Sequence, residues 1–71
     1  MTVYGVCIGS YISENNFMFC EAQNKAEARK AGNLYRRKWE ISDPIQAIVE
    51  IPEGIENVGE RREYAVRGAS A

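Results

Sequence analysis

The residue types that most often carry out chemistry in proteins are scarce in this 71-residue chain. There is no histidine, and the two cysteines, Cys7 and Cys20, lie in apolar runs without a neighbouring motif that would lower a thiol pKa. Two thiols without histidine do not make a zinc site, and the carboxylates show no pairing suited to general acid–base catalysis. We therefore predict a protein that is not an enzyme and that binds no metal or cofactor, with both thiols reduced and buried.

The glycines do not form a nucleotide-binding loop. Gly5, Gly9 and Gly32 lack the spacing of a phosphate-binding fingerprint, and close packing of strands against a helix explains them instead. We expect no small-molecule substrate.

The charge of the chain is small overall but unevenly distributed. The formal net charge is −1, six of the nine basic residues lie between Lys25 and Lys38, and seven of the ten acidic residues lie between Glu40 and Glu63. The sequence therefore predicts a basic helix face and an acidic end, but gives no global argument for binding nucleic acid or an anionic membrane.

The stretch from Phe17 to Trp39 changes its apolar period from that of a strand to that of a helix. In the run Phe17–Ala22, Met18 and Cys20 alternate with the two phenylalanines, as in a strand. Asn24, followed three residues later by Glu27, then resembles a capping box that begins a helix. We predict one continuous helix that buries a stripe of small and aromatic residues: Ala28, Ala31, Gly32, Tyr35 and Trp39.

A second strand-like run, Thr2–Ile12, precedes the first, and a polar break separates the two. We predict an antiparallel hairpin with its turn centred on Ser13 and Glu14. In this register Cys7 lies opposite Cys20, Gly5 opposite Ala22 and Gly9 opposite Met18. The small residues then share one face, on which Tyr35 and Trp39 of the helix would pack.

The sequence after the predicted helix indicates one more strand and a tail. Pro44 ends the helix, and Ile45–Ile51 has the composition of a strand. We assign residues 1–54 to a core domain and residues 55–71 to a C-terminal tail that can add a short edge strand at Tyr64–Val66. The predicted fold is a small α+β domain in the order β-β-α-β.

The predicted hairpin is apolar on both faces, and one helix can cover only one of them. The face opposite the helix would carry an aromatic patch centred on Phe17 and Phe19 and including Val6 and Ile8. The tail, a second copy of the chain or another protein could cover this patch. The last two alternatives make it a partner-binding surface, with Arg29, Arg36 and Arg37 of the helix as a separate rim or as a docking site for an anionic partner.

The N-terminal segment lacks the basic region and the continuous apolar core of a signal peptide, and no apolar run is long enough to span a bilayer. We therefore expect a cytoplasmic protein that does not bind membranes.

Two resemblances bear on function. The run Asn16–Ala22, with Ala28 and Ala31 after it, resembles the third strand and second helix of an RNA-recognition motif, in which the positions of Phe17 and Phe19 stack bases. The expected basic-Gly pair is Asn15-Asn16 here, so we interpret this as shared strand-then-helix patterning.

At the level of pattern, the hairpin ending in Glu-Ala, the helix with Ala at small positions and the Ile-rich return strand resemble small phage and mobile-element proteins, among them some anti-CRISPR inhibitors. That resemblance implies a non-enzymatic protein that binds and blocks a larger host complex. Our first hypothesis is therefore a protein-interaction module or inhibitor, and the alternative is a nucleic-acid-binding module that uses the basic helix face or the aromatic sheet face.

Overall fold

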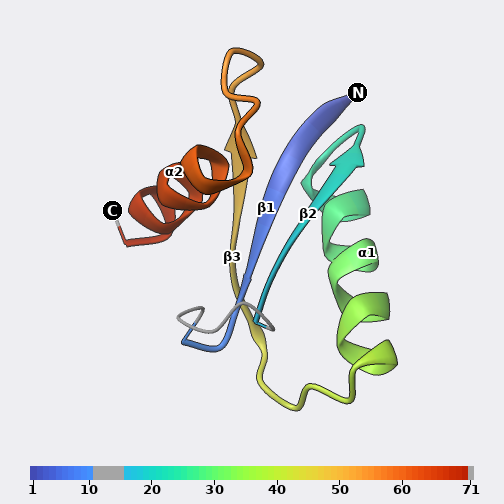
Figure 1. Cartoon of the computed structure of the whole chain (residues 1–71). Helices are drawn as coiled ribbons and strands as arrows, with labels where there is room; N and C mark the ends of the chain where they lie inside the picture. Colours follow the sequence, from blue (N-terminus) through green and yellow to red (C-terminus); the bar gives the residue numbers. More distant parts are fainter. Residues whose placement is uncertain (11–15, 71) are drawn as a thin grey trace.

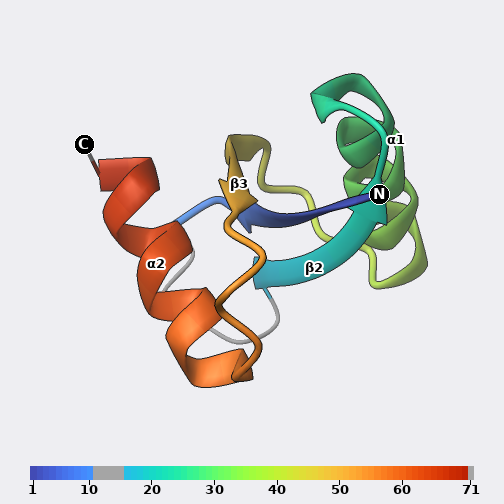
Figure 2. The ribbon, with the colours of Figure 1, turned by 90° about the horizontal axis from the view of Figure 1, so that it is seen from above.

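The computed structural model describes residues 1–10 and 16–70 and shows a three-stranded sheet with a helix on each face (Figures 1 and 2). The sheet is antiparallel in the order β2-β1-β3. The predicted α+β class and the order of hairpin, helix and third strand are confirmed, and a second helix follows. The elements are β1 (Thr2–Ile8), β2 (Phe17–Ala22), α1 (Lys25–Lys38), β3 (Ile45–Ile51) and α2 (Val58–Ser70).

The pairing of β1 with β2 differs from the predicted register by three residues. Tyr4 pairs with Cys20, and Cys7 pairs with Phe17. An odd shift turns every side chain of one strand to the other face, so the predicted grouping of small residues is wrong. Tyr4 and Cys20 instead pack with Ala28 of α1 on one face, whereas Cys7 and Phe17 pack with α2 on the other.

The shift arises where β1 ends. Gly9 has a φ of 57°, in the left-handed region, and its N–H donates to the carbonyl of Pro44 at 2.8 Å. The chain therefore leaves the sheet at Gly9, which was predicted to pair within the hairpin. The predicted strand residues Tyr11 and Ile12 and the predicted turn at Ser13 and Glu14 lie outside the described residues.

The helix α1 begins and continues as predicted. The side chain of Asn24 accepts from the backbone N–H of Glu27 at 2.9 Å, and the Glu27 carboxylate accepts from the backbone N–H of Gln23 at 2.9 Å. Ala28 and Gly32 are buried against the sheet, and the helix runs through Gly32 without a break.

The C-terminal end of α1 differs from the prediction at Trp39. This residue caps the helix and is 60% exposed, so its predicted packing on Gly5, Cys7 and Cys20 is wrong. Glu40 adopts a φ of 53°, and the N–H of Ile41 reaches back to the carbonyl of Arg36 at 2.8 Å, as in a Schellman motif. The chain turns away there, and the indole is left outside the core.

The segment expected to be a tail with a short strand at Tyr64–Val66 instead forms the helix α2. Asn57 accepts from the N–H of Glu60 at 3.2 Å and thereby caps it. Ala65 is fully buried in a core cluster with Cys7 and Phe17, so the segment after Gly54 contributes to the core.

Candidate functional site

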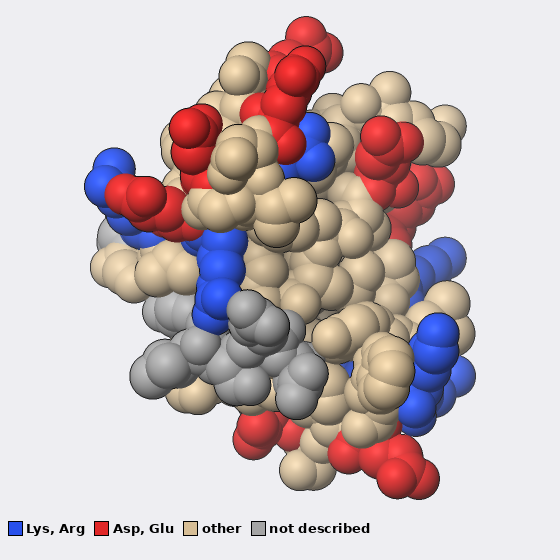
Figure 3. Space-filling view, viewed as in Figure 1, with Lys and Arg blue, Asp and Glu red and all other residues tan. Residues whose placement is uncertain are grey.

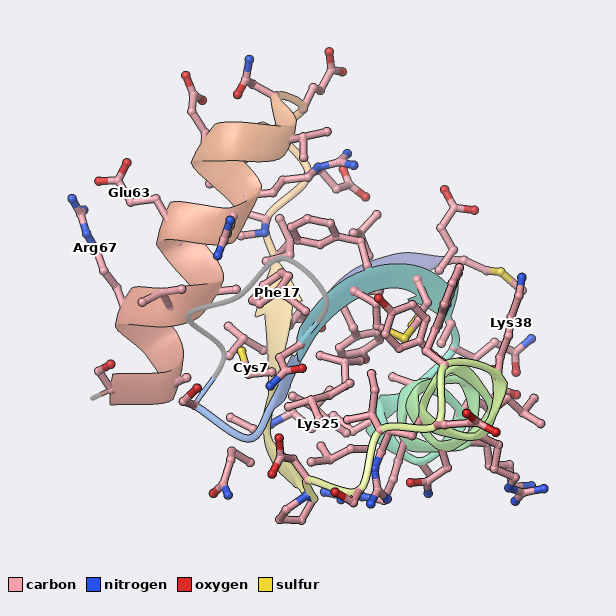
Figure 4. The ribbon with its side chains drawn as sticks, turned by 60° about the horizontal axis from the view of Figure 1, so that its bottom comes forward. Cys7, Phe17, Lys25, Lys38, Glu63 and Arg67 are labelled. Carbon is pink, nitrogen blue, oxygen red and sulfur yellow. The ribbon has the colours of Figure 1, made fainter. Side chains whose placement is uncertain are left out.

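The four apolar residues predicted to form one partner-binding patch do not share a surface. Val6 and Ile8 are fully buried, and Phe17 is 8% exposed. Val6 lies on the α1 face, next to Gly32, whereas Phe17 and Phe19 lie on the α2 face. Figure 4 shows Phe17 and Cys7 between the sheet and α2. The tail, one of the three alternatives, therefore covers Phe17, whereas α1 covers Val6, and Phe19 remains partly exposed.

A hollow remains on the α2 face where α2 does not reach β2. The main contacts of α2 are with β3 and β1. The uncovered part, which we call the β2 groove, has a volume of ≈ 370 Å³ and is lined by Phe17, Met18, Phe19, Val58 and Arg62. Figure 3, viewed as in Figure 1 with α2 on the left and α1 on the right, shows mostly uncharged surface between the two helices and charged side chains around the margin.

The walls of the β2 groove are largely aromatic and aliphatic. The rings of Phe17 and Phe19 meet edge to face, with centroids 5.0 Å apart, so the floor is held in one arrangement. Val58, the first residue of α2, forms the opposite wall and is 67% exposed. Val58 leaves apolar surface in contact with water beside the two phenylalanines, so covering it with an apolar group would be favourable.

The groove lies beside an open strand edge. Within residues 1–10 and 16–70, β2 pairs with β1 on one side and with no strand on the other. Its sequence, FMFCEA, contains one charge and no proline. Natural proteins usually protect an edge strand with charges, prolines or covering elements, and the described part of the chain gives β2 little of this protection.

The three arginines predicted as a rim lie on α1, away from the β2 groove. Arg29 and Arg37 are exposed. Arg36 is half-buried and holds the end of α1: its guanidinium donates to Asn33 Oδ1 at 3.1 Å and to the carbonyl of Ser42 at 3.2 Å. Arg36 therefore has a structural role.

A second surface, which we call the α1 end, consists of Leu34, Tyr35, Arg37, Lys38 and Trp39. The rings of Tyr35 and Trp39 have centroids 6.3 Å apart, and the Lys38 ammonium lies 5.5 Å from the Trp39 ring centroid. Leu34 is 61% exposed on the same helix. Tyr35, Lys38 and Trp39 therefore form one aromatic and basic cluster, and Leu34 and Arg37 are exposed on the same helix.

The two thiols lie on opposite faces of the sheet and are free. Burial raises the pKa of Cys7 to about 11, and burial also raises the pKa of Cys20. A thiol whose pKa lies so far above neutrality is a poor nucleophile. Among the residues that the structure describes, no group of three or more His, Cys, Asp or Glu side chains is placed to hold a metal ion.

The sequence prediction missed α2 and, with it, Val58 and Arg62. A signal was present, because Asn57 followed by Glu60 repeats the spacing of Asn24 and Glu27. Gly59 and Gly68 obscured it, since glycine disfavours helix.

Comparison with protein-family models, with curated proteins and with solved structures finds no match for this chain. No helix in the described part of the chain has the length and apolar character needed to cross a membrane.

Proposed function

We propose that this chain is a non-enzymatic protein-interaction module that binds an extended segment of another protein along β2. The observation that carries the proposal is the position of the β2 groove directly beside the open edge of that strand. A segment that pairs with the edge gains main-chain hydrogen bonds, and its alternate side chains point towards the groove.

The chemistry of the groove specifies the segment. Phe17, Phe19 and Val58 favour aliphatic or aromatic side chains at every second position, and Arg62 favours an acidic group near them. Binding would block whatever the segment does in its own protein, which is how an inhibitor would act. The resemblance to small phage inhibitors stays a prediction, and it would make the target part of a larger host complex.

The proposal is tested by selecting binders from a random peptide library displayed on phage. We expect enriched peptides with apolar residues at alternate positions, and amide chemical-shift changes that concentrate in β2 and around Val58. Peptides whose shift changes cluster elsewhere would contradict the proposal.

One matched pair of variants sharpens the test. Val58→Asp places a charge at the groove in the first turn of α2, where an acidic residue is compatible with the helix dipole. Leu34→Asp places the same charge at a similarly exposed aliphatic residue on α1. We expect Val58→Asp to weaken peptide binding at least tenfold and Leu34→Asp to leave it unchanged. Equal losses would indicate a non-specific apolar contact, and sedimentation of the free chain would reveal whether a second copy occupies the edge.

A further inference from the structure

The α1 end carries exposed apolar side chains next to basic ones, and it is separate from the β2 groove. Trp39, the single tryptophan of the chain, is 60% exposed. Tryptophan is usually buried over most of its surface, so an exposed indole beside Tyr35 indicates a contact surface. Figure 4 shows Lys38 on the side of α1 that points away from the sheet.

The charge around this indole is strongly positive. The helix α1 carries six basic residues and one acidic residue, whereas the rest of the chain carries three basic and nine acidic residues. Three consecutive basic residues, Arg36, Arg37 and Lys38, immediately precede Trp39. Glu40 is the nearest acidic residue along the chain, so the net charge at the α1 end is positive.

A hollow of ≈ 400 Å³ lies where α1 ends and shares Arg37 with the α1 end. It is lined by Asn33, Arg36, Arg37, Glu40, Ile41 and Ser42. The hydrogen bonds of Arg36 to Asn33 and Ser42 fix one wall, while Arg37 is exposed at the rim. An anionic ligand that contacts Arg37 can therefore extend into this hollow.

These features fit a polyanion that also carries flat apolar groups. We propose that the α1 end binds single-stranded nucleic acid, with a base stacked on Trp39 and the flanking phosphates on Arg37 and Lys38. The Lys38 ammonium lies over the indole at 5.5 Å, and its flexible stem lets it follow a phosphate while a base takes its place. A lipid surface fits less well, because Lys38 separates Leu34 from Trp39 and interrupts the apolar strip.

The single tryptophan provides a direct measurement on the intact chain. We expect 12-residue oligo(dT) and oligo(U) to quench its fluorescence at 50 mM salt, with duplex DNA binding more weakly. Heparin supplies anionic groups without bases and should not produce the same quenching. Two or three phosphate contacts predict a fall in affinity of about 7- to 20-fold between 50 and 200 mM salt. Duplex binding as tight as single-strand binding, or equal quenching by heparin, would overturn the proposal.

Two matched pairs of variants, measured by anisotropy of a labelled oligonucleotide, complete the test. Trp39→Ala should weaken binding about tenfold, and Tyr64→Ala, which removes an exposed aromatic ring from α2, should not. Arg37→Gln should reduce the slope of log affinity against log salt by about 0.7, and Arg67→Gln should not. Equal effects within either pair would overturn the proposal, as would a fluorescence response to anionic vesicles without a response to oligonucleotides. Neither result would affect the β2 groove, which Trp39 does not line.

Discussion

Gly32 of α1 lies directly against Val6 of β1. A Cβ atom built on Gly32 would be 2.9 Å from Val6 Cγ1, closer than real Cβ contacts allow, and 3.0 Å from Ile45 Cδ1. Val6 is fully buried in the central strand. The glycine therefore determines how closely the helix approaches the sheet, although glycine itself disfavours helix.

Gly32→Ala should destabilise the protein. Alanine favours helix by about 1 kcal/mol over glycine, but overpacking of a tight core costs about 1–3 kcal/mol, so we expect a net loss of about 1 kcal/mol by chemical denaturation. Gly54→Ala is the control, because a Cβ there meets nothing within 4 Å. A more stable Gly32→Ala variant would mean that the helix can move away from the sheet without cost.

Phe17 should contribute more to stability than Trp39, although the sequence predicts that Trp39 is in the core and that Phe17 is on a surface patch. Phe17 is buried beneath α2, so Phe17→Ala should lower the free energy of unfolding by about 3 kcal/mol. Trp39→Ala removes an exposed ring and should cost about 0.5 kcal/mol or less. Urea denaturation monitored by circular dichroism compares the two variants, and a larger loss for Trp39→Ala would place the indole in the core.

The contrast between these residues indicates what the sequence can and cannot predict. Local signals were sufficient for α1, whose cap at Asn24 lies next to it in the chain, and for the bounds of β3. The register of the hairpin could not be predicted from neighbouring residues. The chain leaves β1 at Gly9, whose N–H donates to the carbonyl of Pro44, 35 residues further along the chain. The exposure of Phe17 and Phe19 likewise depends on where α2 packs. The alternation of residues within β2 cannot predict this.

Stability should fall in alkaline solution because of Cys7. Burial raises the pKa of this thiol from 9.0 to about 11, so the unfolded chain loses the proton at a lower pH than the folded chain. The stabilisation is therefore complete below about pH 9 and is lost as the pH rises towards 11, by on the order of 2 kcal/mol. Denaturation at several pH values measures this loss, and a Cys7→Ala variant should show a smaller decline over the same interval. An identical decline in both proteins would assign the effect to other groups.

The two asparagine caps should affect the molecule differently, although their local geometry is similar. Asn57 accepts from the N–H of Glu60 at 3.2 Å, and Asn24 accepts from the N–H of Glu27 at 2.9 Å, so each cap contributes about 1 kcal/mol to its helix. The helix α1 lies between β2 and β3 in the chain, and its unfolding must disturb the sheet. The helix α2 follows the last strand and can separate from the sheet while β1, β2 and β3 stay paired.

Hydrogen exchange should therefore distinguish Asn57→Ala from Asn24→Ala. We expect Asn57→Ala to reduce protection mainly in α2, and Asn24→Ala to reduce it throughout the sheet, because α2 follows the last strand and can open while all three strands stay paired. Separation of α2 would also uncover Phe17, so Asn57→Ala should increase the binding of a dye that recognises exposed apolar surface. Uniform loss of protection in the Asn57→Ala variant would show instead that α2 and the sheet unfold as one unit, held together by the close packing of Ala65 on Gly5 and Cys7.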